Sequence, residues 1–240
     1  MAFDIIQDEK VFFGGYNLTA SVMSYTLEMS RETQDDTTLN DDSRSNLLGL
    51  RAVTAQVEGL HDAVPYDAGL NDALSLNDTP FSMAMTGTQG GLAYFFNATL
   101  GDYTPIQGSV GDIKGYSAGA ASRGKLVRGI WLLNGSGLSS TGNGTAYEIG
   151  AVAAGQKLYI NTHLYGFNAG GDAISIDIES DASDDFTGSE TTQATIAPAT
   201  SLTSVYTVVD GAITDTWVRP VYTISGSTPS FNVAVFIGVG

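Results

Sequence analysis

The chain has 240 residues, enough to bury a substantial core without disulfides or a structural metal. It contains no cysteine, which excludes disulfides, zinc-thiolate sites and thiol nucleophiles. Its 26 acidic and 10 basic residues give a net charge of −16, which excludes the basic footprint of a nucleic-acid-binding protein and favours a surface past which nucleic acid slides without adhering.

The N-terminal segment MAFDIIQDEK has no basic stretch ahead of an apolar core, so we expect no signal peptide. No apolar run approaches the ~20 residues of a membrane-spanning helix, so we expect no membrane span. The first expected strand covers residues 11–20 (VFFGGYNLTA), where Gly14 and Gly15 indicate a turn or a bulge.

Residues 21–62 are the most distinctive stretch of the chain. Two runs within it alternate between apolar and polar side chains, with the period of two that is typical of half-buried strands. The expected apolar face carries Met23, Tyr25, Leu27 and Met29 in the first run and Val53, Ala55 and Val57 in the second. The expected polar face carries Ser24, Thr26, Glu28 and Ser30 in the first run and Thr54, Gln56 and Glu58 in the second.

Between these two runs lie about twenty residues, far more than the roughly two to five that close an ordinary hairpin. This segment, residues 31–49, is polar and acidic and has almost no apolar content. Long loops of this kind are functional or disordered more often than they are simple connectors. We therefore expect residues 31–49 to be an arm that reaches another molecule. Its expected contact residues are Arg31, Glu32, Gln34, Asp35, Asp36, Asp41, Asp42 and Arg44.

One short helix is expected at residues 65–76 (PYDAGLNDALSL). Leu70, Ala73 and Leu74 share one face of this helix, and Asp67 is placed to cap its first turn.

Residues 134–144 (NGSGLSSTGNG) are rich in Gly, Ser and Asn and nearly uncharged, which is typical of a linker. We therefore expect a β domain at 1–133, a linker at 134–144 and a C-terminal domain at 145–240. Strands are expected at 79–98 and 125–133 before the linker, and at 157–167, 173–179, 204–209, 216–225 and 230–240 after it. Short strands between Gly/Ser/Asp turns predict an all-β fold, with a β-sandwich of jelly-roll type in the C-terminal domain.

Two groups of aspartates invite a cation, but a plainer interpretation is favoured. They are Asp35, Asp36, Asp41 and Asp42 in the arm, and Asp181, Asp184 and Asp185 further on. Their spacing fits no EF-hand loop, so we expect solvated acidic loops, no metal and no cofactor.

Catalysis is not expected either. No G-x-S-x-G motif and no phosphate-cradling G-x-x-x-x-G-K-[ST] motif occurs, which makes a hydrolase on a β scaffold remote. His61 and His163 are expected to be polar surface or interface residues rather than bases. Tyr159, Tyr165 and Trp217 are interpreted as core or rim packing, with a sugar-binding face as the alternative.

The stretch GGYNLTASVMSYTLEMSRETQDDTTLNDDSRSNLLGLRAVTAQVEGLHD resembles the N-terminal part of the tail-tube (major tail) proteins of long-tailed, siphovirus-like bacteriophages. The shared pattern is an apolar strand with a Gly-Tyr-Asn-Leu-Thr turn, an alternating strand, an acidic Thr-rich arm and a second strand. The pieces GGLAYFFNATLGDYTPIQGSVGDIKGYSAGA and LVRGIWL are similar to the closing hairpin of that family. The stretch from GTAYEIG to the end is similar to an extension found in some of its members.

The resemblance implies a tail-tube-type β-sandwich or barrel with one flanking helix. It also implies a structural virion protein of the phage tail, made in the host cytoplasm, whose copies join their sheets into rings, commonly of six. These rings stack into the tube through which viral DNA is ejected. The implied partners are other copies of the chain and tail components such as tape-measure and tail-terminator proteins. Residues 31–49 would reach the adjacent subunit or ring.

The residues support such an assembly in one respect, because long strands with exposed edges are an aggregation hazard that closure across subunits removes. The polar face would then line a wet lumen and repel phosphate, and its expected residues are Ser24, Thr26, Glu28, Thr54, Gln56 and Glu58. The alternative from another class is a capsid decoration or surface-adhesion β-protein with a carbohydrate-binding C-terminal domain. Rings or hollow tubes in electron microscopy distinguish the first interpretation from the second.

Overall fold

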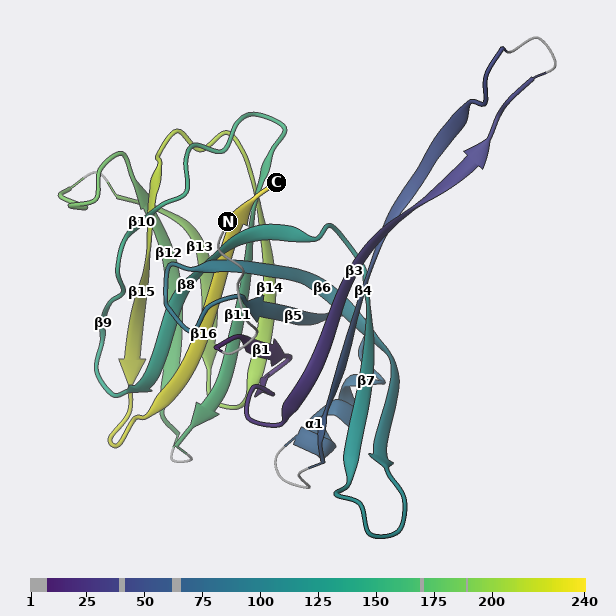
Figure 1. The fold of residues 1–240 in the computed structure, drawn as a ribbon. Coiled ribbons are helices and arrows are strands. Elements are labelled where there is room, and N and C mark those ends of the chain that lie inside the picture. The colour runs from purple at the N-terminus through teal and green to yellow at the C-terminus, as the bar shows by residue number, and fades with distance from the viewer. Residues whose placement is uncertain (1–7, 39–41, 62–65, 169–170, 189) are drawn as a thin grey trace.

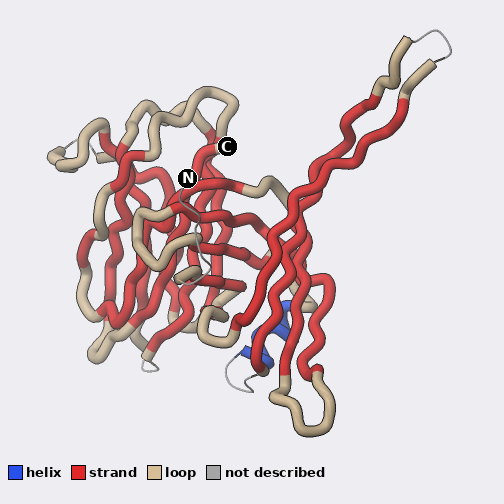
Figure 2. Tube along the Cα trace, viewed as in Figure 1, coloured by secondary structure: helices blue, strands red, loops and turns tan. Residues whose placement is uncertain are grey.

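The computed structural model describes residues 8–38, 42–61, 66–168, 171–188 and 190–240. Within these residues the chain forms antiparallel strands and one short helix, as the ribbon and the tube both show (Figures 1 and 2). The expected all-β class with one short helix is therefore confirmed.

Most strands fall where the sequence pattern predicts them. Up to the expected linker the elements are β1 (Lys10–Phe13), β2 (Tyr16–Asn17), β3 (Val22–Asp35), β4 (Asn46–Leu60), α1 (Tyr66–Ala73), β5 (Thr79–Ala84), β6 (Leu92–Gln107), β7 (Gly115–Ser122) and β8 (Val127–Leu138). The remaining elements are β9 (Gly142–Asn143), β10 (Tyr147–Glu148), β11 (Lys157–Phe167), β12 (Ala173–Asp181), β13 (Thr191–Ala199), β14 (Thr203–Asp210), β15 (Trp217–Ser225) and β16 (Phe231–Val239).

The larger sheet branches at β6, which is long enough to pair with different strands along its two parts. Its first part pairs with β5 and β8, within the path β14-β11-β16-β8-β6-β5-β1-β2. From Ala98 to Gln107 it pairs with β7, which pairs with β4, which pairs with β3. We call this second group, β3, β4, β7 and residues 98–107 of β6, the arm sheet.

The helix covers one face of the arm sheet. Leu70 and Ala73 are buried in the same apolar cluster as Val53, Val57 and Ala118, which come from β4 and β7. The expected helix is too long at its C-terminal end, because the backbone N–H groups of residues 74–76 bond three residues back and form turns rather than further α-helix.

Two residues of the helix, Asp67 and Gly69, make contacts with other elements that the sequence does not predict. Asp67 lies inside the helix and its Oδ1 accepts a hydrogen bond from the Tyr103 hydroxyl at 2.7 Å, so its side chain ties the helix to β6 instead of capping it. Gly69 is required by a close approach, because a Cβ there would overlap the ring of Tyr16.

The smaller sheet packs on the far part of the larger one and forms the expected C-terminal sandwich. Its order is β10-β15-β12-β13, with β9 also paired to β15. The alternating isoleucines Ile174, Ile176 and Ile178 of β12 point into the core between the sheets. β16 is apolar on both faces because it lies between two cores: Val235 packs in the sandwich and Phe236 in a second, aromatic cluster with Phe12 and other residues.

His163 is buried rather than exposed, which corrects the sequence prediction. Its side chain has 0% exposure and lies between β11 and β5. The ring Nδ1 is 2.7 Å from the carbonyl oxygen of Gly14, and Nε2 is 2.8 Å from the hydroxyl of Ser82. The neighbouring Asn161 donates to the carbonyl of Phe81 at 3.1 Å. Asn161 and His163 thus join the C-terminal half of the chain to the N-terminal half through buried polar contacts.

The expected linker is largely hydrogen-bonded strand. β8 continues to Leu138 and pairs with β16, and Gly142 and Asn143 form β9. β8 pairs with β6 on one side and with β16 on the other. Strands from before and after the segment 134–144 therefore belong to one continuous sheet. A division of the chain into two domains at this segment stays a prediction.

Candidate assembly surface

The long loop expected between the two central strands is mostly a two-stranded ribbon. β3 and β4 continue toward each other up to Asp35 and Asn46, where they pair in register. β7 accompanies β4 only as far as Thr54, so residues 46–53 of β4 have β3 as their sole strand neighbour among the described residues. At about 3.3 Å per residue, this ribbon extends about 25 Å beyond the sheet. Figure 1 shows it projecting away from the rest of the molecule.

The expected contact residues of the arm lie on this ribbon and at its end. Those within the described residues are exposed, namely Arg31, Glu32, Gln34, Asp35, Asp36, Asp42 and Arg44, while Asp41 lies outside the described residues. Asp35 accepts hydrogen bonds from the backbone N–H and the hydroxyl of Thr37, and these bonds hold the pKa of its carboxyl below the ordinary value. The local bonds shape the end of the ribbon and leave the charges facing solvent.

The ribbon is also apolar, which the sequence interpretation missed. Met29, Leu47, Leu48 and Leu50 are 58%, 60%, 60% and 90% exposed. The stretch NLLGL carries the signal for these leucines, but it lies within a segment whose composition is otherwise polar. A projecting two-stranded ribbon that displays four large apolar side chains is typical of a surface that a partner covers.

The expected apolar face is only partly covered. Tyr25 and Leu27 are half-buried, while Met23 is 72% exposed because it is the extra residue of a bulge between Val22 and Ser24. Met29 is exposed on the edge strand β3, although Val53, its partner on β4, is buried.

The six residues expected to share a polar face do so. Ser24, Thr26 and Glu28 are paired with Glu58, Gln56 and Thr54, and all six are exposed. The hydroxyl of Ser24 donates to Oε2 of Glu58 at 3.2 Å. The structure therefore brings these side chains together, and whether they line a lumen stays a prediction.

This polar face continues across β7 and β6, with residues that the sequence interpretation did not include. Gln56 pairs with Gly119 of β7, which pairs with Asp102 of β6. A Cβ at Gly119 would overlap the side chains of both Gln56 and Asp102, so these two side chains lie over the same glycine. The face therefore spans four strands and includes a third acidic residue, Asp102, besides Glu28 and Glu58.

The arm sheet has two open edges among the described residues. β3 pairs with β4 alone, and β6 beyond Ala98 pairs with β7 alone, since β5 begins opposite Ala98 and runs away from this part of β6. Pro105 lies in this part of β6, and proline within sheets is confined to edges and bulges because it has no N–H to donate. Open edges of this length are hazards in a monomer.

The other candidate sites are structural. Tyr159 and Tyr165 pack against the aromatic cluster of the larger sheet, whereas Trp217 begins β15 in the smaller sheet, so the three do not form one sugar-binding face. His61 is half-buried at the end of β4, and its backbone N–H donates to the carbonyl of Lys114.

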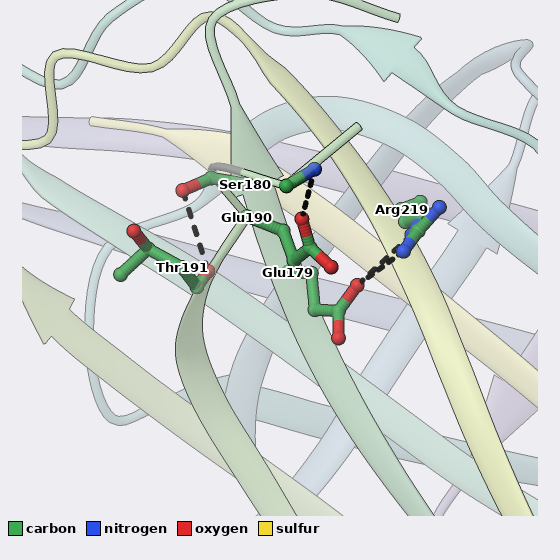
Figure 3. Close-up of polar contacts among 6 residues, drawn as sticks. Glu179, Ser180, Glu190, Thr191 and Arg219 are labelled. Carbon is green, nitrogen blue, oxygen red and sulfur yellow. Dashed lines mark hydrogen bonds and ion pairs between the residues drawn. The ribbon is translucent and has the colours of Figure 1, made fainter. Parts of the chain in front are cut away.

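Asp184 and Asp185 are exposed in the loop that follows β12, whereas Asp181 is the last residue of β12 and is buried, so the expectation of a solvated loop is wrong for Asp181. An ion pair joins β12 to β15 beside this loop. Arg219 of β15 lies 2.8 Å from Glu179 of β12, with both side chains more than four-fifths buried, as Figure 3 shows. The guanidinium also lies 4.3 Å from the ring centre of Phe186 in that loop. Among the described residues no group of three or more His, Cys, Asp or Glu side chains is placed to hold a metal ion. No helix in the described part of the chain is long and apolar enough to cross a membrane.

No protein-family model matches the chain, and no curated protein matches it. Among solved structures, a chain from the virion of a native gene transfer agent particle aligns with 18% identity and a TM-score of 0.41, covering 50% of this chain and 93% of its own. A chain from the tail of an empty gene transfer agent particle, refined with C6 symmetry, aligns with 16% identity and a TM-score of 0.40, covering 48% and 92%. The Dit protein of phage SPP1 aligns with 11% identity and a TM-score of 0.35, covering 98% and 100%.

Proposed function

We propose that this chain is a structural subunit of a phage-like tail, and specifically a tail-tube subunit that forms stacked rings around a channel for DNA. The observation that carries the proposal is the arm sheet, which has two open edges, one polar face and one face covered by a helix. The role is mechanical and electrostatic and involves no catalysis or cofactor.

Strand direction supports closure into a ring. Each neighbouring pair in the order β3, β4, β7, β6 is antiparallel, so β6 runs opposite to β3. When β3 of one copy is placed beside residues 99–104 of β6 in the next copy, the new pair is also antiparallel. Every copy then adds four strands to one continuous antiparallel barrel, and no edge remains unpaired. The number six for the ring comes from the sequence resemblance alone.

The two faces of the arm sheet support its orientation in that ring. The helix and the buried cluster cover one face of the arm sheet, which supports an arrangement with this face on the outside of the barrel. The polar face then lines the channel with Glu28, Glu58 and Asp102 in each copy, together with neutral Ser24, Thr26 and Gln56. Carboxylates repel phosphate, so DNA passes without specific binding.

The ribbon supports stacking. It leaves the arm sheet along the strand direction, which is the direction of the tube axis in a barrel apart from strand tilt. Its exposed apolar and charged side chains would be covered by a copy in the adjacent ring. The proposed location is thus the virion tail, with other copies of the chain, a tape-measure protein and a tail-terminator protein as partners.

Electron microscopy of the purified protein at increasing concentration tests the proposal. We expect rings with a central channel and, at higher concentration, hollow tubes. A protein that remains monomeric, or that forms discrete trimers and binds glycans, contradicts it and favours the decoration or adhesion alternative.

A further inference from the structure

Two exposed apolar groups lie on the arm sheet, one on the ribbon and one on the turn that joins β6 to β7. The arm patch consists of Met29 and Leu48, which share the face of the ribbon that carries Arg31 and Arg51, while Leu47 pairs with Gln34 and lies on the opposite face. The turn patch consists of Ile106, Val110 and Ile113, which are 57%, 107% and 77% exposed. All residues from 104 to 114 are exposed, so nothing in the described part of the chain covers this turn.

The two patches lie at opposite ends of the same sheet. Gly115, at the start of β7, pairs with Leu60 at the end of β4 and with Gln107 at the end of β6. The turn of residues 108–114 is therefore next to the base of the β3-β4 hairpin, and the arm patch is near its far end. Figure 1 shows the ribbon and the β6-β7 turn pointing in opposite directions. The sheet between the patches prevents them from meeting within one chain.

One face of the ribbon carries charges that suit a contact with an acidic residue, although the arm as a whole is acidic, with Glu32, Asp35, Asp36, Asp41 and Asp42 against Arg31, Arg44 and Arg51. Arg31 and Arg51 are directly opposite each other on the ribbon and both are exposed. Like charges in directly opposed positions destabilise a strand pair. Within the ribbon the Nε–H of Arg31 donates to the carbonyl oxygen of Gly49 at 2.8 Å. Arg31, Arg51 and Arg44 place three of the ten basic residues of the chain on this arm. On the turn, the exposed Asp112 lies between Val110 and Ile113 and accepts a hydrogen bond from the N–H of Ser109 at 2.9 Å.

We propose that the arm patch of one copy docks on the turn patch of a second copy of this chain, with Arg31 and Arg51 facing Asp112. The contact is head-to-tail, so it leaves a free arm at one end and a free turn at the other and repeats into an open stack. This inference rests on the proposed function and adds the surface that receives the arm.

The absence of cysteine in the chain makes disulfide trapping a clean test. Two separate proteins, Leu48→Cys and Val110→Cys, are mixed, assembled and oxidised, with a mass tag on one of them. In an equal mixture a cysteine-bearing arm meets a cysteine-bearing turn at about half of its contacts, so we expect about half of the chains to enter tagged heterodimers. The double variant should give a ladder of higher multimers. The matched control combines Leu48→Cys with Val208→Cys, an exposed position on β14.

Each other result contradicts the docking in a recognisable way. Efficient homodimers of Leu48→Cys alone indicate that arms pair with arms, and equal trapping at position 208 indicates random collision. Tubes in electron micrographs of the same sample without trapped heterodimers contradict the docking but not the proposed function. A sample without rings or tubes contradicts both.

Discussion

The imidazole Nε2 of His163 lies 2.8 Å from the hydroxyl oxygen of Ser82, although the two residues are 81 positions apart in the chain. Together with the contact from Nδ1 to the carbonyl of Gly14, this places a fully buried histidine between β11 of the C-terminal half and β1 and β5 of the N-terminal half. Burial lowers the pKa of His163 from its ordinary value of 6.5 to about 4. The junction of the two halves is therefore sensitive to acid.

The first prediction is a loss of stability between pH 6.5 and pH 4. Above this window His163 is neutral in both states. Within this window the unfolded chain binds a proton that the folded chain does not. The free energy of unfolding therefore decreases as the pH is lowered, and His163 contributes up to about 3 kcal/mol of this decrease. Urea unfolding at pH 7, 5.5 and 4.5 measures the change. In His163→Gln the slope from this group should vanish; an unchanged slope would contradict the assignment.

The second prediction concerns the close approach of β8 and β16. A Cβ at Gly129 would overlap the backbone carbonyl of Ile237, which cannot move without disturbing the ladder. We expect Gly129→Ala to lower the free energy of unfolding by about 1–3 kcal/mol. Gly101→Ala is the matched control, because the nearest atom to its added Cβ is at 3.7 Å. Equal stability of the two variants in chemical denaturation would show that the ladder adjusts freely.

The third prediction separates ring formation from stacking. Removing residues 30–52 and joining Met29 to Val53 by a short turn deletes the ribbon, with Arg31, Leu48 and Arg51, while leaving the paired strands below it. We expect rings to form and tubes to fail, as measured by electron microscopy and sedimentation. Tubes of normal length from this variant would refute the role of the arm.

The fourth prediction concerns the charge of the polar face. Replacing Glu28, Glu58 and Asp102 by lysine reverses its sign, so we expect the tubes to retain DNA at low salt and to release it as salt rises. DNA held in the channel should be protected from nuclease. The matched control places three lysines at Asp184, Asp185 and Glu190, which are exposed in the part of the chain around the β12-β13 loop. Protection by the control alone, or by neither, would argue against a lumenal face.

The sequence predicted the features that depend on local alternation. The burial of Val53, Ala55 and Val57 opposite exposed Thr54 and Gln56 follows from a period of two, and the structure confirms it. The length of the segment between the two runs predicts the arm. It does not predict that the arm is a paired ribbon, because the pairing of residues 31–35 with 46–51 depends on a register that neither strand specifies by itself.

The features that sequence reasoning missed depend on contacts between distant segments. Asp102 joins the polar face only because β6 changes neighbours at Ala98, and His163 is buried only because β11 packs on β5. The segment 134–144 has the composition of a linker, yet β16 supplies hydrogen bonds that make its first part a strand. Tertiary pairing thus overrides local composition at these places.

A cryo-electron microscopy map of the assembled protein, with separated strands, tests the central claim most directly. The account predicts that β3 of one copy lies antiparallel to residues 99–104 of β6 in the next, with Thr26, Gln56 and Asp102 facing the channel. A ring in which these two edges do not meet, or in which the helix-covered face lines the channel, would contradict it.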